Sequence, residues 1–121
     1  GAAAAAVPAT SKARRNLLGE LKVYQVALTI HSASNLPRMD MLSADPFAVA
    51  SLANSEAELA LGVVDRCTTR VVESDRNPKF EQSFLLVATD SAPLLQVALF
   101  DWSSDKDPRF MGATVVHLRG L

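Results

Sequence analysis

The sequence predicts an all-β domain in which short antiparallel strands form a sandwich, and three observations support this prediction. After residue 20, apolar and polar residues alternate over short segments, as in half-buried strands. Turn-forming residues separate these segments at regular intervals. No long helical periodicity follows residue 20, which disfavours a parallel sheet with crossover helices.

The first expected strand covers residues 22–33, where Val26, Leu28 and Ile30 fall on one face. The same alternation returns in the segments 46–52, 61–72, 80–88, 94–100 and 112–118. Their expected core-facing residues are Phe47 and Val49, then Phe80, Phe84 and Leu86, then Leu95, Val97 and Leu99. About seven short strands are therefore expected, and the loops between them gather at the two ends of the sandwich.

The chain of 121 residues, 49% of them hydrophobic, is long enough for one core and too short for two. We expect residues 1–19 to form a flexible, alanine-rich and basic tail, and residues 20–121 to form the sandwich domain. The basic cluster at Lys12, Arg14 and Arg15 leaves two interpretations of the tail open, a linker or an arm that contacts membranes. No apolar run is long enough to cross a bilayer and no secretion signal begins the chain, so a soluble, cytoplasmic domain is expected.

Several classes of function are disfavoured by composition. The formal net charge of −1 argues against a nucleic-acid partner. Cys67 is the single cysteine, so no internal disulfide forms, and with no histidine nearby it is expected to be a half-buried strand residue rather than a reactive thiol. His31 and His117 lack a second ligand at metal spacing. No nucleophile with a base and no phosphate loop is present, so no enzymatic activity is expected.

Three loop segments carry more than turn chemistry: "NLPRMDMLSADPF" (35–47), "ESDRNPKFEQSF" (73–84) and "LFDWSSDKDPRFMG" (99–112). In their order and spacing they resemble the C2 family of calcium- and phospholipid-binding modules, over residues 21–121. Within that family, residues 61–80 are most similar to the corresponding stretch of copines. The resemblance implies an eight-stranded antiparallel β-sandwich, seven strands of which are visible in the sequence, and a role in signalling or vesicle trafficking.

The resemblance also implies a calcium site formed by aspartates from two loops. The two aspartates of the family's first loop fall on Asp40 and Asp45, and the first aspartate of its third loop falls on Asp101. At two further ligand positions this chain has Ser103 and Arg109 in place of aspartate.

Calcium takes about six to eight oxygen ligands. With two acidic ligands missing, two interpretations stay open. The loops form either one weak calcium site or an acidic site that does not respond to calcium, because Arg109 supplies a permanent positive charge there. Asp105 and Asp107 are additional candidate ligands, although the family pattern does not support them.

Two lipid-binding surfaces are expected. Met41, Leu42 and Trp102 lie beside the acidic loops and are candidates for insertion among lipid headgroups, with ordinary loop packing as the alternative. Arg66 and Arg70, four residues apart on the same face of one strand, form with Lys79 a thin basic patch.

The function expected is that of a module that is peripheral to membranes and binds anionic phospholipid with weak or degenerate calcium dependence. The alternative is a calcium-independent protein-interaction domain with a protein partner. An immunoglobulin-like domain is disfavoured by the lone cysteine. The eighth strand remains to be placed, either outside this chain or near residues 17–22.

Overall fold

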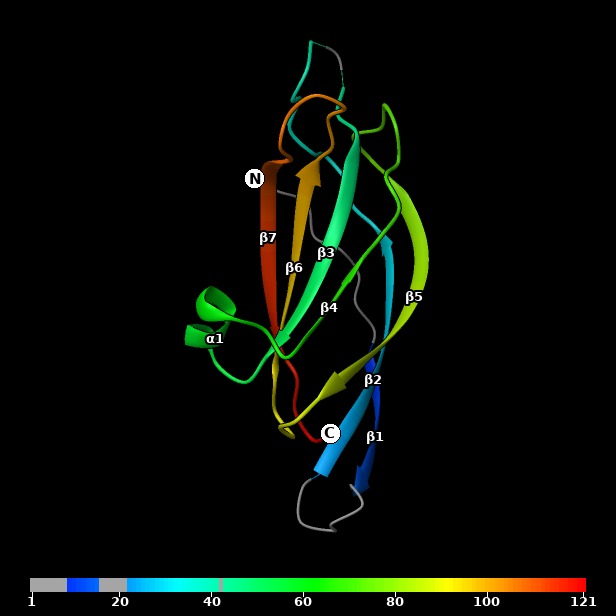
Figure 1. The fold of residues 1–121 in the computed structure, drawn as a ribbon. Helices are drawn as coiled ribbons and strands as arrows, with labels where there is room; N and C mark the ends of the chain where they lie inside the picture. Colours follow the sequence, from blue (N-terminus) through cyan, green and yellow to red (C-terminus); the bar gives the residue numbers. More distant parts are fainter. Residues whose placement is uncertain (1–8, 16–21, 42) are drawn as a thin grey trace.

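Two antiparallel sheets face each other across one apolar core in the computed structural model of the chain, which describes residues 9–15, 22–41 and 43–121 (Figure 1). The elements are β1 (Ala9–Arg15), β2 (Lys22–Ser32), β3 (Pro46–Ala53), α1 (Glu56–Leu61), β4 (Asp65–Thr68), β5 (Lys79–Ala88), β6 (Leu94–Asp101) and β7 (Arg109–His117). One sheet has the order β1-β2-β5 and the other has the order β4-β3-β6-β7. The predicted all-β sandwich is confirmed.

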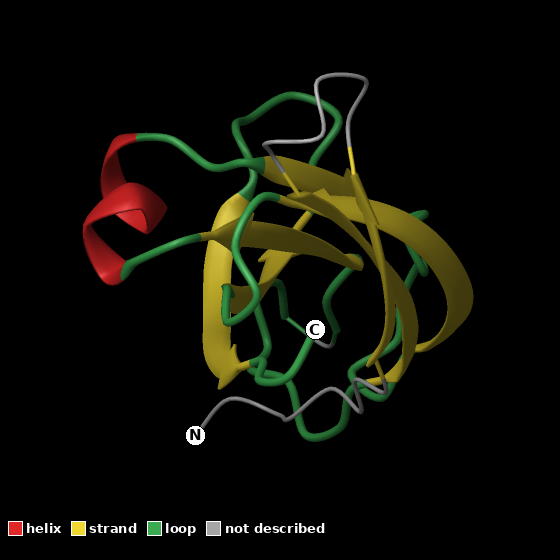
Figure 2. Ribbon diagram, turned by 90° about the horizontal axis from the view of Figure 1, so that it is seen from below, coloured by secondary structure: helices red, strands yellow, loops and turns green. Residues whose placement is uncertain are grey.

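The core lies between the inner faces of the two sheets. Val26, Leu28 and Ile30 on β2 are fully buried, as the alternation predicts. Leu95 and Leu99 of β6 meet them from the other sheet and are also buried. Figure 2, viewed roughly along the strands, shows the two curved sheets around this interior and α1 outside it.

The orientation of β3 differs from the prediction, which placed Phe47 and Val49 on the face that points into the core. The core residues of this strand include Ala48, Ala50 and Leu52, whereas Phe47 and Val49 are only half-buried. Both faces of β3 are apolar, so alternation alone does not tell which face is inside. The structure places small side chains inward and the phenylalanine on the outer face of the sheet.

The segment between β3 and β5 also differs from the prediction of one strand over residues 61–72. The short helix α1 precedes it, and β4 covers only Asp65–Thr68. The sequence carries a signal for this helix, because Ser55 and Glu58 have the spacing of a capping box. The Ser55 hydroxyl accepts the Glu58 N–H, and the Glu58 carboxylate accepts the N–H of Asn54, the residue before the N-cap. Among the described residues, no helix is long and apolar enough to cross a membrane.

Strand β1 lies within the segment 1–19 that was predicted to be a flexible tail. Ala9–Arg15 pairs with β2 along its whole length, from Ala9 opposite Leu28 to Arg15 opposite Lys22. The tail prediction therefore fails for these residues, while residues 1–8 and 16–21 lie outside the described part of the chain. Within the described residues, no strand pairs with the other edge of β1, and the expected eighth strand is not found there.

Cys67 lies half-buried on β4 and packs against the core, as predicted. Burial is the largest cause that raises the pKa of its thiol from 9.0 to about 11, because the thiolate would lose hydration. The hydrogen bond with Ala50 lowers the pKa slightly, and the negative charge of Asp65 raises it further.

We predict that Cys67 reacts slowly with iodoacetamide in the folded chain. At pH 8 the raised pKa leaves about a hundredfold less thiolate than an unburied cysteine would have, and the thiolate is the reactive form. The alkylation rate, measured by mass spectrometry, should rise with pH through about 11 in the folded chain and level off near 9.0 in urea. A folded-state rate that levels off near pH 9 would contradict the prediction.

Candidate functional site

Three loops meet at the upper end of the sandwich in Figure 1: residues 33–45, 69–78 and 102–108. They follow β2, β4 and β6. Strands β4 and β6 run in the same direction because both are antiparallel to β3, and Figure 1 shows β2 running toward the same end in the other sheet. The topology therefore brings side chains that are far apart in sequence to one end of the fold.

Asp101, the last residue of β6, occupies the centre of this end. It is paired with Pro46 of β3 on one side and with Arg109 of β7 on the other. Its side chain is 1% exposed, and its Oδ1 accepts a hydrogen bond of 2.7 Å from the Asp45 N–H. The Asp45 carbonyl in turn accepts the Trp102 N–H at 2.9 Å.

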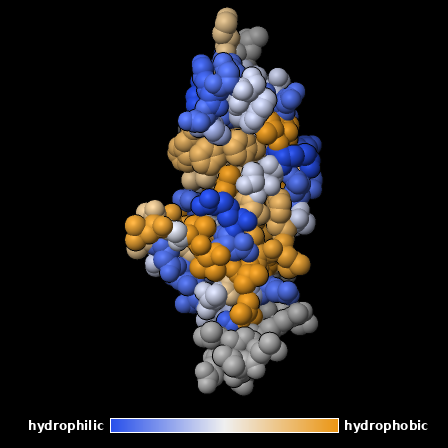
Figure 3. All heavy atoms as spheres, in the orientation of Figure 1, coloured by the Kyte–Doolittle hydropathy of each residue, from blue (hydrophilic) through white to orange (hydrophobic). Residues whose placement is uncertain are grey.

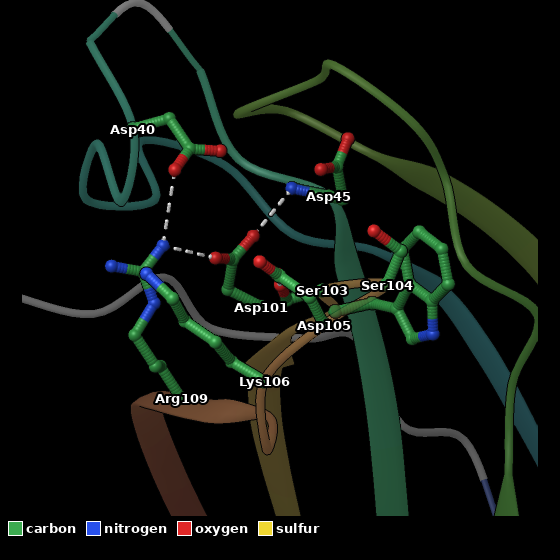
Figure 4. A pocket seen from close by; sticks show the side chains of 9 residues that line it. Asp40, Asp45, Asp101, Ser103, Ser104, Asp105, Lys106 and Arg109 are labelled. Carbon is green, nitrogen blue, oxygen red and sulfur yellow. Dashed lines mark hydrogen bonds and ion pairs between the residues drawn. The ribbon is translucent and has the colours of Figure 1, made fainter.

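Arg109 supplies the cation for this buried carboxylate. Its Nη2 lies 2.7 Å from Asp101 Oδ2 and 3.2 Å from Asp40 Oδ1, and Figure 4 shows it reaching from the start of β7 between the two acids. The hydrogen bond to Asp101 is the main cause that raises the pKa of Arg109 above its usual value, with a smaller contribution from Asp40. The guanidinium therefore lies between Asp40 of the first loop and Asp101 at the end of β6.

Hydrogen bonds of the backbone also fix the positions of the other two aspartates. Asp45 Oδ1 accepts the N–H of Ser74, at 2.8 Å, and Ser74 has a φ of 53° in the left-handed region. Asp40 lies in a turn in which its own N–H donates to the Ser43 carbonyl at 3.1 Å. Carboxylate oxygens of Asp40, Asp45 and Asp101 lie within 4.8 Å of one another, so the structure brings together the three predicted ligands.

These residues line a cleft of about 250 Å³, the acidic cleft. Its lining comprises Asp40, Asp45, Asp101, Trp102, Ser103, Ser104, Asp105, Lys106 and Arg109. The four carboxylates and two cationic side chains have a formal charge of −2. Lys106 was not predicted as a residue of the site, although a lysine between Asp105 and Asp107 is a sequence signal for a cation there.

The two additional candidate ligands differ in position. Asp105 lines the cleft, and its Oδ1 accepts a 2.7 Å hydrogen bond from the Ser103 hydroxyl. Asp107 is exposed and does not line the cleft. Asp105 is therefore placed to assist a cation, whereas Asp107 would first have to move.

The residues predicted to enter lipid headgroups lie near the cleft. Met41 is 92% exposed and Trp102 is 42% exposed, so neither is a core residue. Leu42 lies outside the described residues.

The predicted basic patch is not formed as expected. Arg66 points outward on β4, but Arg70 follows the end of that strand at Thr68, so the prediction of two arginines on one strand face is wrong. Arg70 Nη2 lies 3.5 Å from the carbonyl of Lys79, the first residue of β5. Arg70 therefore lies beside Lys79, past the end of the strand that carries Arg66.

The donor set fits one calcium ion only after a rearrangement. Both oxygens of Asp101 and one oxygen each of Asp40 and Asp45 already accept hydrogen bonds. Calcium requires several carboxylate oxygens at about 2.3–2.6 Å. Because Arg109 lies against two of the three acids, the guanidinium would have to leave before an ion could reach them.

An acidic cleft between the loops of an antiparallel sandwich defines a loop-end binding module, and comparison with protein families identifies the class. The model of the C2 domain family matches residues 24–121, so the chain belongs to the C2 domain family. C2 domains are non-catalytic modules that generally bind phospholipid membranes, commonly with calcium, and sometimes bind proteins. A search among curated protein sequences finds no match.

Solved structures of C2 domains share this fold. The C2A domain of plant extended synaptotagmin 1 matches with a TM-score of 0.65 and 23% identity over 76% of this chain and 66% of that one. The RIM C2A domain from Drosophila matches with a TM-score of 0.59 and 20% identity over 89% of this chain and 82% of that one. Human GIVD cytosolic phospholipase A2 matches with a TM-score of 0.63 and 17% identity over 89% of this chain and 14% of that one.

We predict that the stability contributions of Asp101 and Arg109 are coupled. Asp101→Asn should lower the free energy of unfolding by about 1–3 kcal/mol, because it removes the charge from a hydrogen-bonded pair at a buried position. In an Arg109→Gln background the same change should cost much less. Urea unfolding of the four chains measures this coupling.

Lys106→Gln provides the matched control, because Lys106 lines the same cleft but forms no ion pair with Asp101 among the described residues. Its effect should add to that of Asp101→Asn. Additive effects of Asp101→Asn and Arg109→Gln would show that the ion pair contributes nothing measurable.

Proposed function

We propose that this chain is a membrane-targeting C2 module whose loop end binds anionic phospholipid, and whose calcium dependence is weak because Arg109 already pairs with the acids. The observation that carries the proposal is the position of the Arg109 guanidinium, 2.7 Å from Asp101 and 3.2 Å from Asp40. A cation there reduces the repulsion between the acidic loops and an anionic surface. In this proposal the module is non-catalytic, cytoplasmic and peripheral to membranes.

The charge of the cleft supports a weak rather than an absent calcium effect. With Arg109 and Lys106 in place the lining still has a formal charge of −2, which one calcium ion would neutralise. Calcium must compete with Arg109 for Asp40 and Asp101, and this competition lowers the apparent affinity. A site with a single weakly bound ion follows, with Asp40, Asp45 and Asp101 as ligands and Asp105 as an added oxygen donor.

The position of exposed apolar side chains supports insertion into a headgroup layer. Met41 and Trp102 belong to the first and third loops and lie at the same end of the fold as the acidic cleft. Tryptophan is favoured at the boundary between apolar and wet surroundings. The loop end therefore combines apolar contacts with a charge that is only partly neutralised.

A protein-interaction domain is the second candidate, and the same ion pairs favour it. When Arg109 satisfies the acids, the loop end is held together without calcium. Arg66, Arg70 and Lys79 also give little basic surface for lipid, since each cation near an anionic membrane contributes about 1 kcal/mol.

We predict that Met41→Ala weakens binding to phosphatidylserine-containing vesicles by about three- to tenfold, because it removes an apolar side chain that would enter the membrane. Leu61→Ala is the matched control, since Leu61 is 89% exposed on α1, away from the loop end. Vesicle sedimentation with calcium and with a chelator measures both. No sedimentation in either condition would reject the membrane function.

We also predict that Arg109→Asp raises calcium affinity by about tenfold or more, because the change removes the competing cation and adds a carboxylate. Calcium titration followed by amide shifts or calorimetry reports the affinity. Asp101→Asn in that background should remove the calcium signal. Unchanged affinity in Arg109→Asp would show that Arg109 does not control the site.

A further inference from the structure

The outer face of the four-stranded sheet is unusually apolar for a surface turned toward solvent. Strand pairing aligns outward-facing residues in rows across β3, β6 and β7. The rows are Phe47–Phe100–Phe110, Val49–Ala98–Ala113 and Ser51–Gln96–Val115. The exposed face of an antiparallel sheet normally carries polar residues. Figure 3, which views this side of the molecule, shows light orange residues in a band below the blue loop end.

The three phenylalanines form an ordered aromatic row. The rings of Phe47 and Phe100 are stacked with centroids 5.7 Å apart, and those of Phe100 and Phe110 meet edge to face at 5.8 Å. Phe110 is 61% exposed. A register shift between Leu99 and Phe100 on β6 places Phe110 outward, while the next residue, Met111, is buried. The ring arrangement is preorganised by backbone pairing, which limits the entropy lost when a ligand binds.

Two adjoining shallow hollows lie along β3 on this face. The first, of about 250 Å³, is lined by Phe47, Val49, Phe100 and Pro108. The second, of about 340 Å³, is lined by Val49, Ser51, Arg66, Thr68, Gln96, Ala98 and Phe100. They share Val49 and Phe100, so together they form one groove, the outer groove, apolar at the loop end and polar at the other.

Arg66 is the one charged residue in the lining of the outer groove. Among the described residues it forms no ion pair. The neighbouring Asp65 does not neutralise it across the groove, because its two oxygens accept the N–H groups of Arg66 and of Val87 on β5. The groove therefore offers an apolar site at one end and, at the other end, one cation that could pair with an anionic group.

We infer that the outer groove binds a peptide segment of a partner protein, one that carries a bulky apolar side chain and a carboxylate. The apolar side chain contacts the aromatic row and Pro108, and the carboxylate pairs with Arg66. Ser51, which lies opposite Arg66, is four residues from Phe47 on β3, a separation of about 13 Å along the strand. An extended peptide covers that distance with about four residues, which sets the spacing of its two anchors.

Charge complementarity favours this occupant over the other candidates. A second copy of the chain has no carboxylate in the same groove to pair with Arg66. A bilayer surface would gain only about 1 kcal/mol from a single cation. This inference is independent of the acidic cleft, since no acid of the cleft lines the groove.

The test is selection of a displayed library of random short peptides on the immobilised chain, without calcium or vesicles. Enriched peptides should carry an apolar residue and an acidic residue about four positions apart. Their Kd, measured by fluorescence anisotropy, should rise about tenfold or more in Phe110→Ser and in Arg66→Glu. Amide shifts on binding should centre on Val49 and Phe100.

Leu85→Ser is the matched control, because Leu85 is 68% exposed but lies on β5 of the other sheet, and it should retain peptide binding. Thermal unfolding of each variant shows whether the chain is folded. Met41→Ala should also retain peptide binding, so failure of the membrane function and failure of this inference are distinguishable.

Three results would overturn the inference. The first is enrichment of the same peptides on the chain and on the Phe110→Ser, Arg66→Glu double variant. The second is loss of vesicle binding in Phe110→Ser without any groove-dependent peptide, which would assign the face to lipid. The third is a concentration-dependent dimer that Phe110→Ser abolishes, which would assign it to a second copy.

Discussion

The loop end of this domain depends on one buried carboxylate. Asp101 is almost fully buried, and a buried charge is costly unless it is paired and hydrogen-bonded. Its two oxygens are satisfied from opposite sides, one by the backbone of Asp45 and the other by the Arg109 guanidinium. The same residue therefore links the start of β3, the end of β6 and the start of β7, and it holds the acidic loops in a fixed relation.

The positive charge of Arg109 differs from that of a bound ion, because it does not depend on the concentration of any ion. An ion that binds reversibly makes the charge of the cleft depend on its concentration, whereas a side chain is present at every concentration. In the proposed function calcium competes with Arg109 for Asp101 and Asp40, so the strength of these ion pairs would set the calcium response. Under that proposal, Arg109 would leave the three aspartates in place and reduce the dependence of the domain on the ion.

The same strand ends create two surfaces with opposite chemistry. Asp101 and Arg109 belong to the acidic cleft, and their neighbours Phe100 and Phe110 belong to the aromatic row. Adjacent residues on a strand point to opposite sides, so the cleft and the row arise from one register. A shift of one residue between β6 and β7 would disrupt both, because every side chain would change face. The two surfaces are nevertheless separate in chemistry, and they can serve different partners.

The sequence by itself determined the sandwich, its main apolar faces and the family, because alternation and turn residues are local properties of the chain. It also identified Asp40, Asp45 and Asp101, since their spacing follows a family pattern. It did not determine which face of β3 is inside, because both faces of "PFAVASLA" are apolar and only packing against the other sheet selects Ala48 and Ala50. Nor did it predict that Ala9–Arg15 pairs with β2 as β1, or that β4 ends at Thr68. The ion pairs of Arg109 and the aromatic row were decided by tertiary structure, since each joins residues that become neighbours only when separate strands align.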